Sequence, residues 1–133
     1  MFWLKGARYI WHGGPGMLTY LPGHTHYGPP LDEHHVNGWV VLAIERYLNA
    51  CGWNKDKARR YYPVVSEIAR FFSSMLEPRG QDKFQIRYLP SHSQAESTDT
   101  VNKPNIFDVL ASAKWSLMVA LRMSHFLGID EAE

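Results

Sequence analysis

The sequence predicts an all-α fold with three main helices, near residues 35–51, 63–76 and 106–127. Three observations support this prediction. Apolar residues recur at helical spacing within each range, the connecting segments are rich in residues that interrupt helices, and one short stretch alternates in the manner of a strand. With 133 residues, of which 45% are hydrophobic, the chain is long enough to bury one modest core.

Residues 1–31 contain six glycines and four prolines, so they predict turns and loops, with Arg8–Trp11 as a candidate short strand. The first helix is expected from about His35, because Trp39–Ile44 is a continuous apolar run. Gly52 marks its end. A helix that is apolar on nearly every side is expected to be buried on nearly every side.

The second helix has its apolar positions on one face, which predicts an amphipathic helix. Pro63 is expected to divide it into a short turn near residues 55–61 and a longer helix over 63–76. Residues 84–89 alternate and predict a strand, and residues 90–105 predict a polar loop. Gly128 ends the third helix. The predicted apolar stripes are Ala58, Tyr61, Val65, Ile68, Phe72 and Met75 in the second helix, and Val109, Leu110, Ala113, Leu117, Leu121 and Phe126 in the third.

The order of these helices indicates a larger architecture. A buried helix, an amphipathic helix and a second buried helix alternate as they do in helical toroids, where an inner ring of helices is surrounded by an outer ring. Three helices cannot close such a ring, so we expect residues 1–133 to be part of a larger domain. In a monomer the first and third helices would then expose apolar faces, which predicts self-association.

Composition excludes several kinds of partner. A net charge of +1 with 20% charged residues gives no sign of nucleic-acid binding. The single cysteine, Cys51, allows no internal disulfide and no cysteine-based metal motif. No run approaches the roughly 18 apolar residues of a membrane span, so no membrane partner is expected. The sequence predicts no cofactor and does not indicate a cellular location.

The segment Asp32-Glu33-His34-His35 lies between a loop rich in Gly, Pro and His and the apolar first helix. A carboxyl group in such a place, beside aromatic rings, suits the protonation of a sugar leaving group. A charged neighbour, Asp32, and burial against rings are both expected to raise the pKa of Glu33. The alternative is an ordinary acid that stabilises the dipole at a helix N-terminus. Spacing alone leaves both interpretations open.

The histidines invite a metal interpretation, which the sequence does not favour. Adjacent histidines on a helix point about 100° apart, so His34 and His35 are poorly placed to share a metal. The spacings typical of zinc sites are absent as well. We therefore expect no metal, and we interpret the histidines as hydrogen-bonding partners of a sugar or of the loop.

Two other places have residues suited to sugar binding. Trp11 and His12, followed by Gly13 and Gly14, form either a stacking platform or a core tryptophan beside a turn. Glu96, in the polar loop, is either a solvated carboxylate or a substrate ligand.

In order along the chain, four segments resemble one glycoside hydrolase family, which includes acid trehalases, kojibiose and maltose phosphorylases and protein-glucosylgalactosylhydroxylysine glucosidases. Gly6–Trp11 resembles its GA-x-[YF]-P-W segment, and Glu33–Ala43 its E-x-H-[IV]-N-G motif with the apolar helix that follows. Arg60–Val65 is similar to its outer-helix start, and Val101–Asn105 lies where the family has an asparagine-rich loop. The resemblance covers nearly the whole chain.

The resemblance implies an (α/α)6 toroid, the six-hairpin glycosidase architecture, of which this chain would be a catalytic-domain fragment. It implies that Glu33 is the general acid and that Trp11 and His35 lie in the sugar subsite. The neighbours His12, Asp32 and His34 are further candidates for substrate binding, together with Glu96 from the polar loop. The implied partner is a carbohydrate.

The chain departs from the family in two respects. Ile10 replaces the usual proline, and residues 12–30 do not resemble the family's acidic insert. Hydrolysis with inversion needs two carboxyl groups about 6.5–9.5 Å apart. In the family, the second carboxylate of the hydrolases, or the phosphate-binding loop of the phosphorylases, is expected further along the sequence than residue 133.

The function expected from the sequence is part of an inverting glycoside hydrolase, or of a related phosphorylase, that acts in carbohydrate metabolism. The 133-residue chain by itself is expected to be inactive. The alternative is a non-catalytic helical module that binds a carbohydrate or a protein partner.

Overall fold

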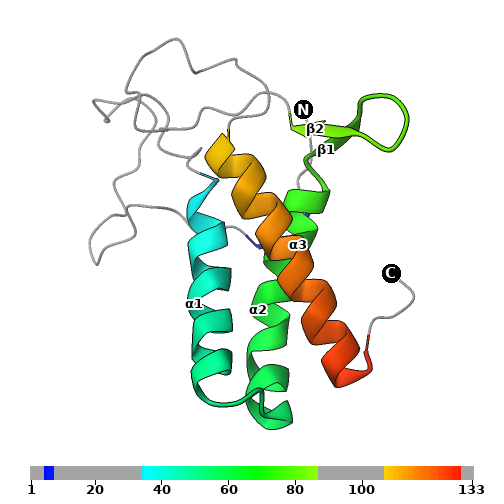
Figure 1. The fold of residues 1–133 in the computed structure, drawn as a ribbon. Coiled ribbons are helices and arrows are strands. Elements are labelled where there is room, and N and C mark those ends of the chain that lie inside the picture. Colours follow the sequence, from blue (N-terminus) through cyan, green and yellow to red (C-terminus); the bar gives the residue numbers. More distant parts are fainter. Residues whose placement is uncertain (1–4, 8–33, 87–106, 130–133) are drawn as a thin grey trace, which may run out of the picture.

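The computed structural model describes residues 5–7, 34–86 and 107–129 (Figure 1). Three helices make up most of these residues, and a small two-stranded antiparallel sheet follows the second helix. The all-α prediction is therefore confirmed. The elements are α1 (Val36–Ala50), α2 (Lys55–Ser73), β1 (Leu76–Pro78), β2 (Phe84–Ile86) and α3 (Phe107–Leu127).

Local sequence explains where the helices begin and end. Asn54 caps α2 by accepting hydrogen bonds from the backbone N–H groups of Asp56 and Lys57. Gly128 has a φ of +67° and follows the last turn of α3, where its N–H donates to the carbonyl of Ser124 over 2.7 Å. Glycine reaches this left-handed conformation without strain, so it ends the helix as expected.

Pro63 does not divide the second helix, contrary to the sequence prediction, because α2 runs unbroken from Lys55 to Ser73. A proline removes the hydrogen bond to the carbonyl four residues earlier, here that of Arg59. Both Arg59 and Pro63 are exposed. Water can therefore satisfy that carbonyl, and the helix tolerates the proline on its wet side.

The three helices pack side by side, with α1 and α3 parallel and α2 antiparallel to both (Figure 1). The N-termini of α1 and α3 and the C-terminus of α2 consequently lie at the same end of the bundle, and we call this the mouth end. Helix α3 packs against both other helices. Helices α1 and α3 are therefore direct neighbours.

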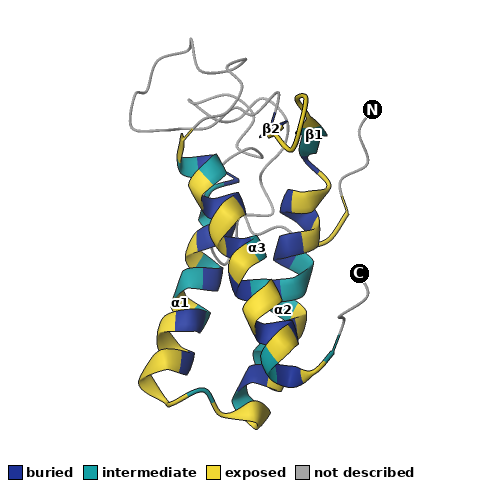
Figure 2. Cartoon of the chain, turned by 45° about the vertical axis from the view of Figure 1, so that its right-hand side comes forward, coloured by how far each residue is buried: buried dark blue, intermediate teal, exposed yellow. Residues whose placement is uncertain are grey.

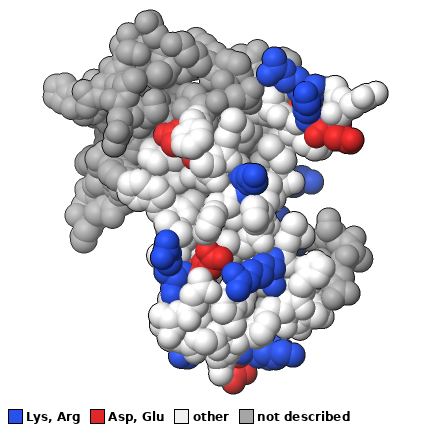
Figure 3. Space-filling view, in the orientation of Figure 1, with Lys and Arg blue, Asp and Glu red and all other residues white. Residues whose placement is uncertain are grey.

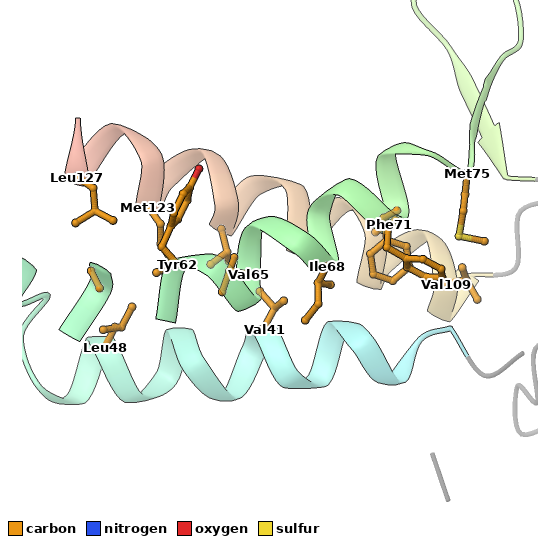
Figure 4. Packing of buried hydrophobic residues seen from close by; sticks show 14 of the residues in the cluster. Val41, Leu48, Tyr62, Val65, Ile68, Phe71, Met75, Val109, Met123 and Leu127 are labelled. Carbon is orange, nitrogen blue, oxygen red and sulfur yellow. The ribbon is translucent and has the colours of Figure 1, made fainter. Parts of the chain in front are cut away.

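The core fills the space between the three helices (Figure 4). All three helices contribute buried side chains to it. Examples are Val41 and Leu48 of α1, Val65 and Ile68 of α2, and Met123 of α3. Each helix buries one side and exposes the other (Figure 2). The prediction of all-round burial for the first helix is therefore wrong. Among the described residues each helix packs against only two other helices, and these leave part of its surface exposed.

Helix α3 buries a different face from the one its apolar stripe predicts. Val109 and Ala113 are buried as expected, but Leu121 is 60% exposed. Three serines lie inside instead, Ser112, Ser116 and Ser124. Small side chains let helices approach closely, and this allows α3 to pack tightly against its neighbours.

Large apolar side chains consequently remain on the outer face of α3. The spacing of Phe107, Trp115, Met118 and Leu121 places them on one side of the helix. All four are exposed, from 42% for Trp115 to 83% for Phe107. On α1, Trp39 is exposed as well.

Charged side chains of both signs are scattered in small groups over the face shown in Figure 3. On the part of this face that the described residues form, no broad field of one sign is seen, which agrees with the near-zero net charge of +1. None of the described helices has the length and hydropathy of a membrane span.

Away from the mouth end, Arg122 joins three parts of the fold. Its guanidinium lies 3.3 Å from the carboxylate of Glu45, a buried residue of α1, and 4.0 Å from the ring centre of Trp53, in the connection to α2. Trp53 in turn donates to Asn49 over 2.6 Å and meets Phe126 edge-on. A buried carboxylate needs such a partner, because its desolvation is otherwise uncompensated.

Replacing Arg122 with methionine should therefore destabilise the fold, by about 1–3 kcal/mol, because the variant loses the ion pair and the ring contact but keeps an apolar stem. Urea denaturation measures the change. The matched control is Arg46→Met on α1, since Arg46 is exposed and makes no ion pair among the described residues. Equal shifts in the two variants would contradict the structural role of Arg122.

The outer face of α3 should make the chain self-associate, because it groups several large apolar side chains. Sedimentation velocity should show species larger than a monomer. The double variant Met118→Lys with Leu121→Lys should restore the monomer. Ala50→Lys with Gln81→Lys adds the same charge at exposed positions outside α3 and should leave the association intact. A compact wild-type monomer with a sharp thermal transition would contradict this prediction.

Candidate functional site

Two of the predicted site residues, His34 and His35, lie in the described part of the chain. They precede α1 at the mouth end. Trp11, His12, Asp32, Glu33 and Glu96 lie outside the described residues, so their predicted roles stay predictions.

His34 is buried against α2. Its side chain packs on Phe71, with ring centres 5.3 Å apart, and the residue is 3% exposed. Its backbone carbonyl accepts hydrogen bonds from the side chain of Asn37, over 2.9 Å, and from the Asn37 N–H, over 3.2 Å. Asn37 is itself fully buried. These contacts fix the turn that leads into α1.

His35 occupies the N-cap position of α1 and faces α3. Its Nδ1 atom lies 3.8 Å from Oδ2 of Asp108, and its backbone carbonyl accepts a hydrogen bond of 2.9 Å from the hydroxyl of Ser112. The ring of Trp39 meets the imidazole edge-on, with centres 5.8 Å apart. His35 is therefore held by α3 through both its ring and its backbone.

Gly38 allows α1 and α3 to approach at this point. A Cβ atom at residue 38 would lie 2.5 Å from the Cβ of Ser112 and 2.8 Å from its Cα. No side chain larger than hydrogen fits there without displacing a helix. Structure thus explains both residues of the Asn37-Gly38 pair. Asn37 makes a buried hydrogen bond, and Gly38 allows the close contact between the helices.

A close contact also explains the glycine at position 6. The segment Lys5–Ala7 lies along the C-terminal half of α2, where Ala7 N–H donates to the carbonyl of Glu67 over 3.2 Å and the Lys5 N–H to Ser74 Oγ over 3.2 Å. Gly6 has a φ of +85°, and a Cβ atom there would overlap the Glu67 carbonyl. The Gly-Ala pair of the first resembling segment therefore anchors the chain to α2.

The candidate residues outside the described ranges belong to two segments, and the structure describes the residues that flank each segment. Ala7 and His34 flank residues 8–33, and both contact α2 in its C-terminal half. Ile86, paired with Leu76 just after α2, and Phe107, the first residue of α3, flank residues 87–106. The described residues on either side of these two ranges therefore all lie near the mouth end.

The start of α1 bears on the two interpretations of Glu33. The helix begins at Val36, and its first turn contains no acidic residue. Glu33 precedes the N-cap by two residues, and stabilisation by the helix dipole falls off within the first turn. Glu33 itself lies outside the described residues, so both interpretations stay open.

Asp108 and Ser112 were not among the residues singled out from the sequence. Both lie on α3, one helical turn apart, and both contact His35. An acidic residue in the first turn of a helix is common, and a serine within an apolar helix is no specific sign of a functional site. Their role depends on a contact across more than seventy residues, for which the sequence holds no signal. Within the described ranges, no group of three His, Cys, Asp or Glu side chains is arranged to hold a metal ion.

No known family profile matches this chain. It is 26% identical over 126 residues to a kojibiose hydrolase from Mucilaginibacter mallensis. The aligned region covers 94% of this chain and 18% of that relative, so the chain spans less than a fifth of the relative's length. The similarity supports a relationship with glycoside hydrolases.

Gly38→Ala tests the contact between α1 and α3. In an ordinary helix this change stabilises by up to about 1 kcal/mol, but here the added methyl group overlaps Ser112, and overpacking typically costs about 1–3 kcal/mol. We expect a net loss of stability in urea denaturation. In a double-mutant cycle, Ser112→Gly should recover part of the loss. An alanine variant as stable as the wild type would contradict the contact.

Proposed function

We propose that this chain is part of the catalytic domain of a six-hairpin glycoside hydrolase, and that Glu33 is its general acid. The observation that carries the proposal is the similarity to a kojibiose hydrolase along 94% of the chain. Glu33 belongs to the segment Glu33–Gly38, which resembles the E-x-H-[IV]-N-G motif, and the histidines of this segment lie at the mouth end of the bundle.

The helix arrangement supports the toroidal part of the proposal. Two parallel helices linked through an antiparallel one are the repeating unit of a double ring, with α1 and α3 on the inside and α2 on the outside. The exposed apolar faces of α1 and α3 also fit this arrangement. In a completed ring, further hairpins would cover such faces.

The proposed chemistry begins with protonation of the glycosidic oxygen by Glu33. A base outside this chain would activate a water molecule on the opposite face of the sugar, giving inversion. In a phosphorylase, inorganic phosphate would take the place of that water. The similarity favours hydrolysis, and it favours a glucoside such as kojibiose as the substrate. Trp11, His12 and His35 would contact the sugar, with Asp32, His34 and Glu96 around it.

Glu33→Gln, made in a longer protein that contains residues 1–133, tests the general acid. Glutamine keeps the shape and much of the hydrogen bonding but cannot deliver the proton. Hydrolysis of kojibiose should fall by about 10²–10⁴-fold, the usual contribution of general acid catalysis. An aryl glucoside with an activated leaving group needs less protonation and should lose much less activity.

The control variant is Glu67→Gln, since Glu67 lies on α2 and its carboxylate pairs with Arg70 at the surface. It should leave both activities unchanged. Equal losses on the two substrates after Glu33→Gln, or no loss on either, would refute the assignment of Glu33. Sugar binding without any turnover by the wild-type protein would favour a non-catalytic helical module instead.

A further inference from the structure

We propose that the outer face of α2, near its N-terminus, is a docking surface for an acidic segment of a partner protein. Three cationic side chains form this surface, Lys55, Arg59 and Arg60, and we call it the basic surface. It lies at the opposite end of α2 from the mouth end, so the inference goes beyond the proposed function and does not depend on it.

The three side chains are exposed and near one another. Lys55 and Arg59 are about one helical turn apart on α2, and Arg60 follows directly. None of the three takes part in an ion pair among the described residues. In Figure 3, Lys and Arg atoms gather at the lower end of the molecule, where Figure 1 places the start of α2.

The position of these charges is unfavourable for the helix itself. Lys55 is the first residue of α2, where the positive end of the helix dipole disfavours a cation. Lys55 and Arg59 also repel each other, because like charges four residues apart destabilise a helix. Within the described part of the chain, no carboxylate pairs with these cations to offset the repulsion. The charge therefore does not stabilise the fold, and an external partner accounts for it.

Lys57 lies in the same two turns but has a different role. A hydrogen bond to the side chain of Cys51 and the neighbouring Tyr47 raise the pKa of Lys57 above its usual value. Its ammonium group lies 5.4 Å from the centre of the Tyr47 ring, on α1. Lys57 therefore belongs to the contact between α1 and α2, and it is not part of the basic surface.

The side chains of the basic surface define the chemistry of the partner. A guanidinium group binds a carboxylate through two parallel hydrogen bonds, so Arg59 and Arg60 suit aspartate and glutamate side chains. Among the described residues, no exposed large apolar side chain lies on α2, so charge and not apolar burial drives the contact. Single-stranded nucleic acids are bound by long positive grooves with exposed aromatic rings, which this helix face does not offer. An acidic protein segment fits better.

The first test titrates the 133-residue chain into a fluorescent peptide of alternating glutamate and serine and follows its anisotropy. The wild type should bind the peptide, and raising the salt concentration from about 0.05 M to about 0.2 M should weaken binding, because salt screens exposed charges. The double variant Arg59→Gln with Arg60→Gln should weaken binding by about three- to tenfold, since each exposed ion pair contributes modestly.

The matched control is Arg79→Gln with Lys83→Gln, which removes the same charge from exposed positions between β1 and β2. It should leave the affinity for the peptide unchanged. Equal weakening in the two double variants, or no binding by the wild type, would overturn the inference. A single-stranded oligonucleotide that binds more tightly than the peptide would also overturn it, because the surface would then belong to a nucleic-acid partner.

The second test separates docking from stability. Lys55→Glu places an acid at the start of α2, so it should raise the midpoint of urea denaturation while it weakens binding of the acidic peptide. Lys83→Glu makes the same change of charge outside the helices and should have neither effect. A lower urea midpoint for Lys55→Glu would overturn the inference, because the cation would then stabilise the fold itself.

Discussion

The close approach of α1 and α3 is the constraint on which the rest of the structure depends. Gly38 lies so near Ser112 that a single methyl group would not fit between them. Because the two helices are parallel, this one contact brings their N-termini together. The hydroxyl of Ser112 then bonds to the His35 carbonyl, and the carboxylate of Asp108 comes within 3.8 Å of its ring.

Sequence patterns predicted the helices better than the faces they bury. The helix ends at Gly52 and Gly128 follow from glycine chemistry and were found near the expected places. The buried face of α3 was not predictable from its apolar residues, because large apolar side chains surround much of this helix. Small serines lie on the buried side instead, and Ser112 is small enough to let α3 approach α1 at Gly38. Tyr62 of α2 is buried where Tyr61 was expected, a shift of one position within the same face.

The candidate site was likewise predictable only in part. The motif around His35 is visible in the sequence because its members are neighbours in the chain. The reasons for Asn37 and Gly38 are not visible in the sequence. Asn37 bonds to the backbone carbonyl of His34, and Gly38 contacts Ser112 on α3. Asp108 could not be predicted as a partner of His35, because the pairing depends on the register between two helices. Only the packing of α1 against α3 establishes that register.

That register is fixed at two separate levels. At the mouth end, Ser112 bonds to His35. Further along the same two helices, Arg122 pairs with the buried carboxylate of Glu45. Two contacts about ten residues apart on each helix prevent both sliding and rotation, whereas one contact would leave rotation free. The orientation of His35 and Ser112 at the mouth end is therefore determined by the helices themselves, which is what the proposed sugar subsite would require.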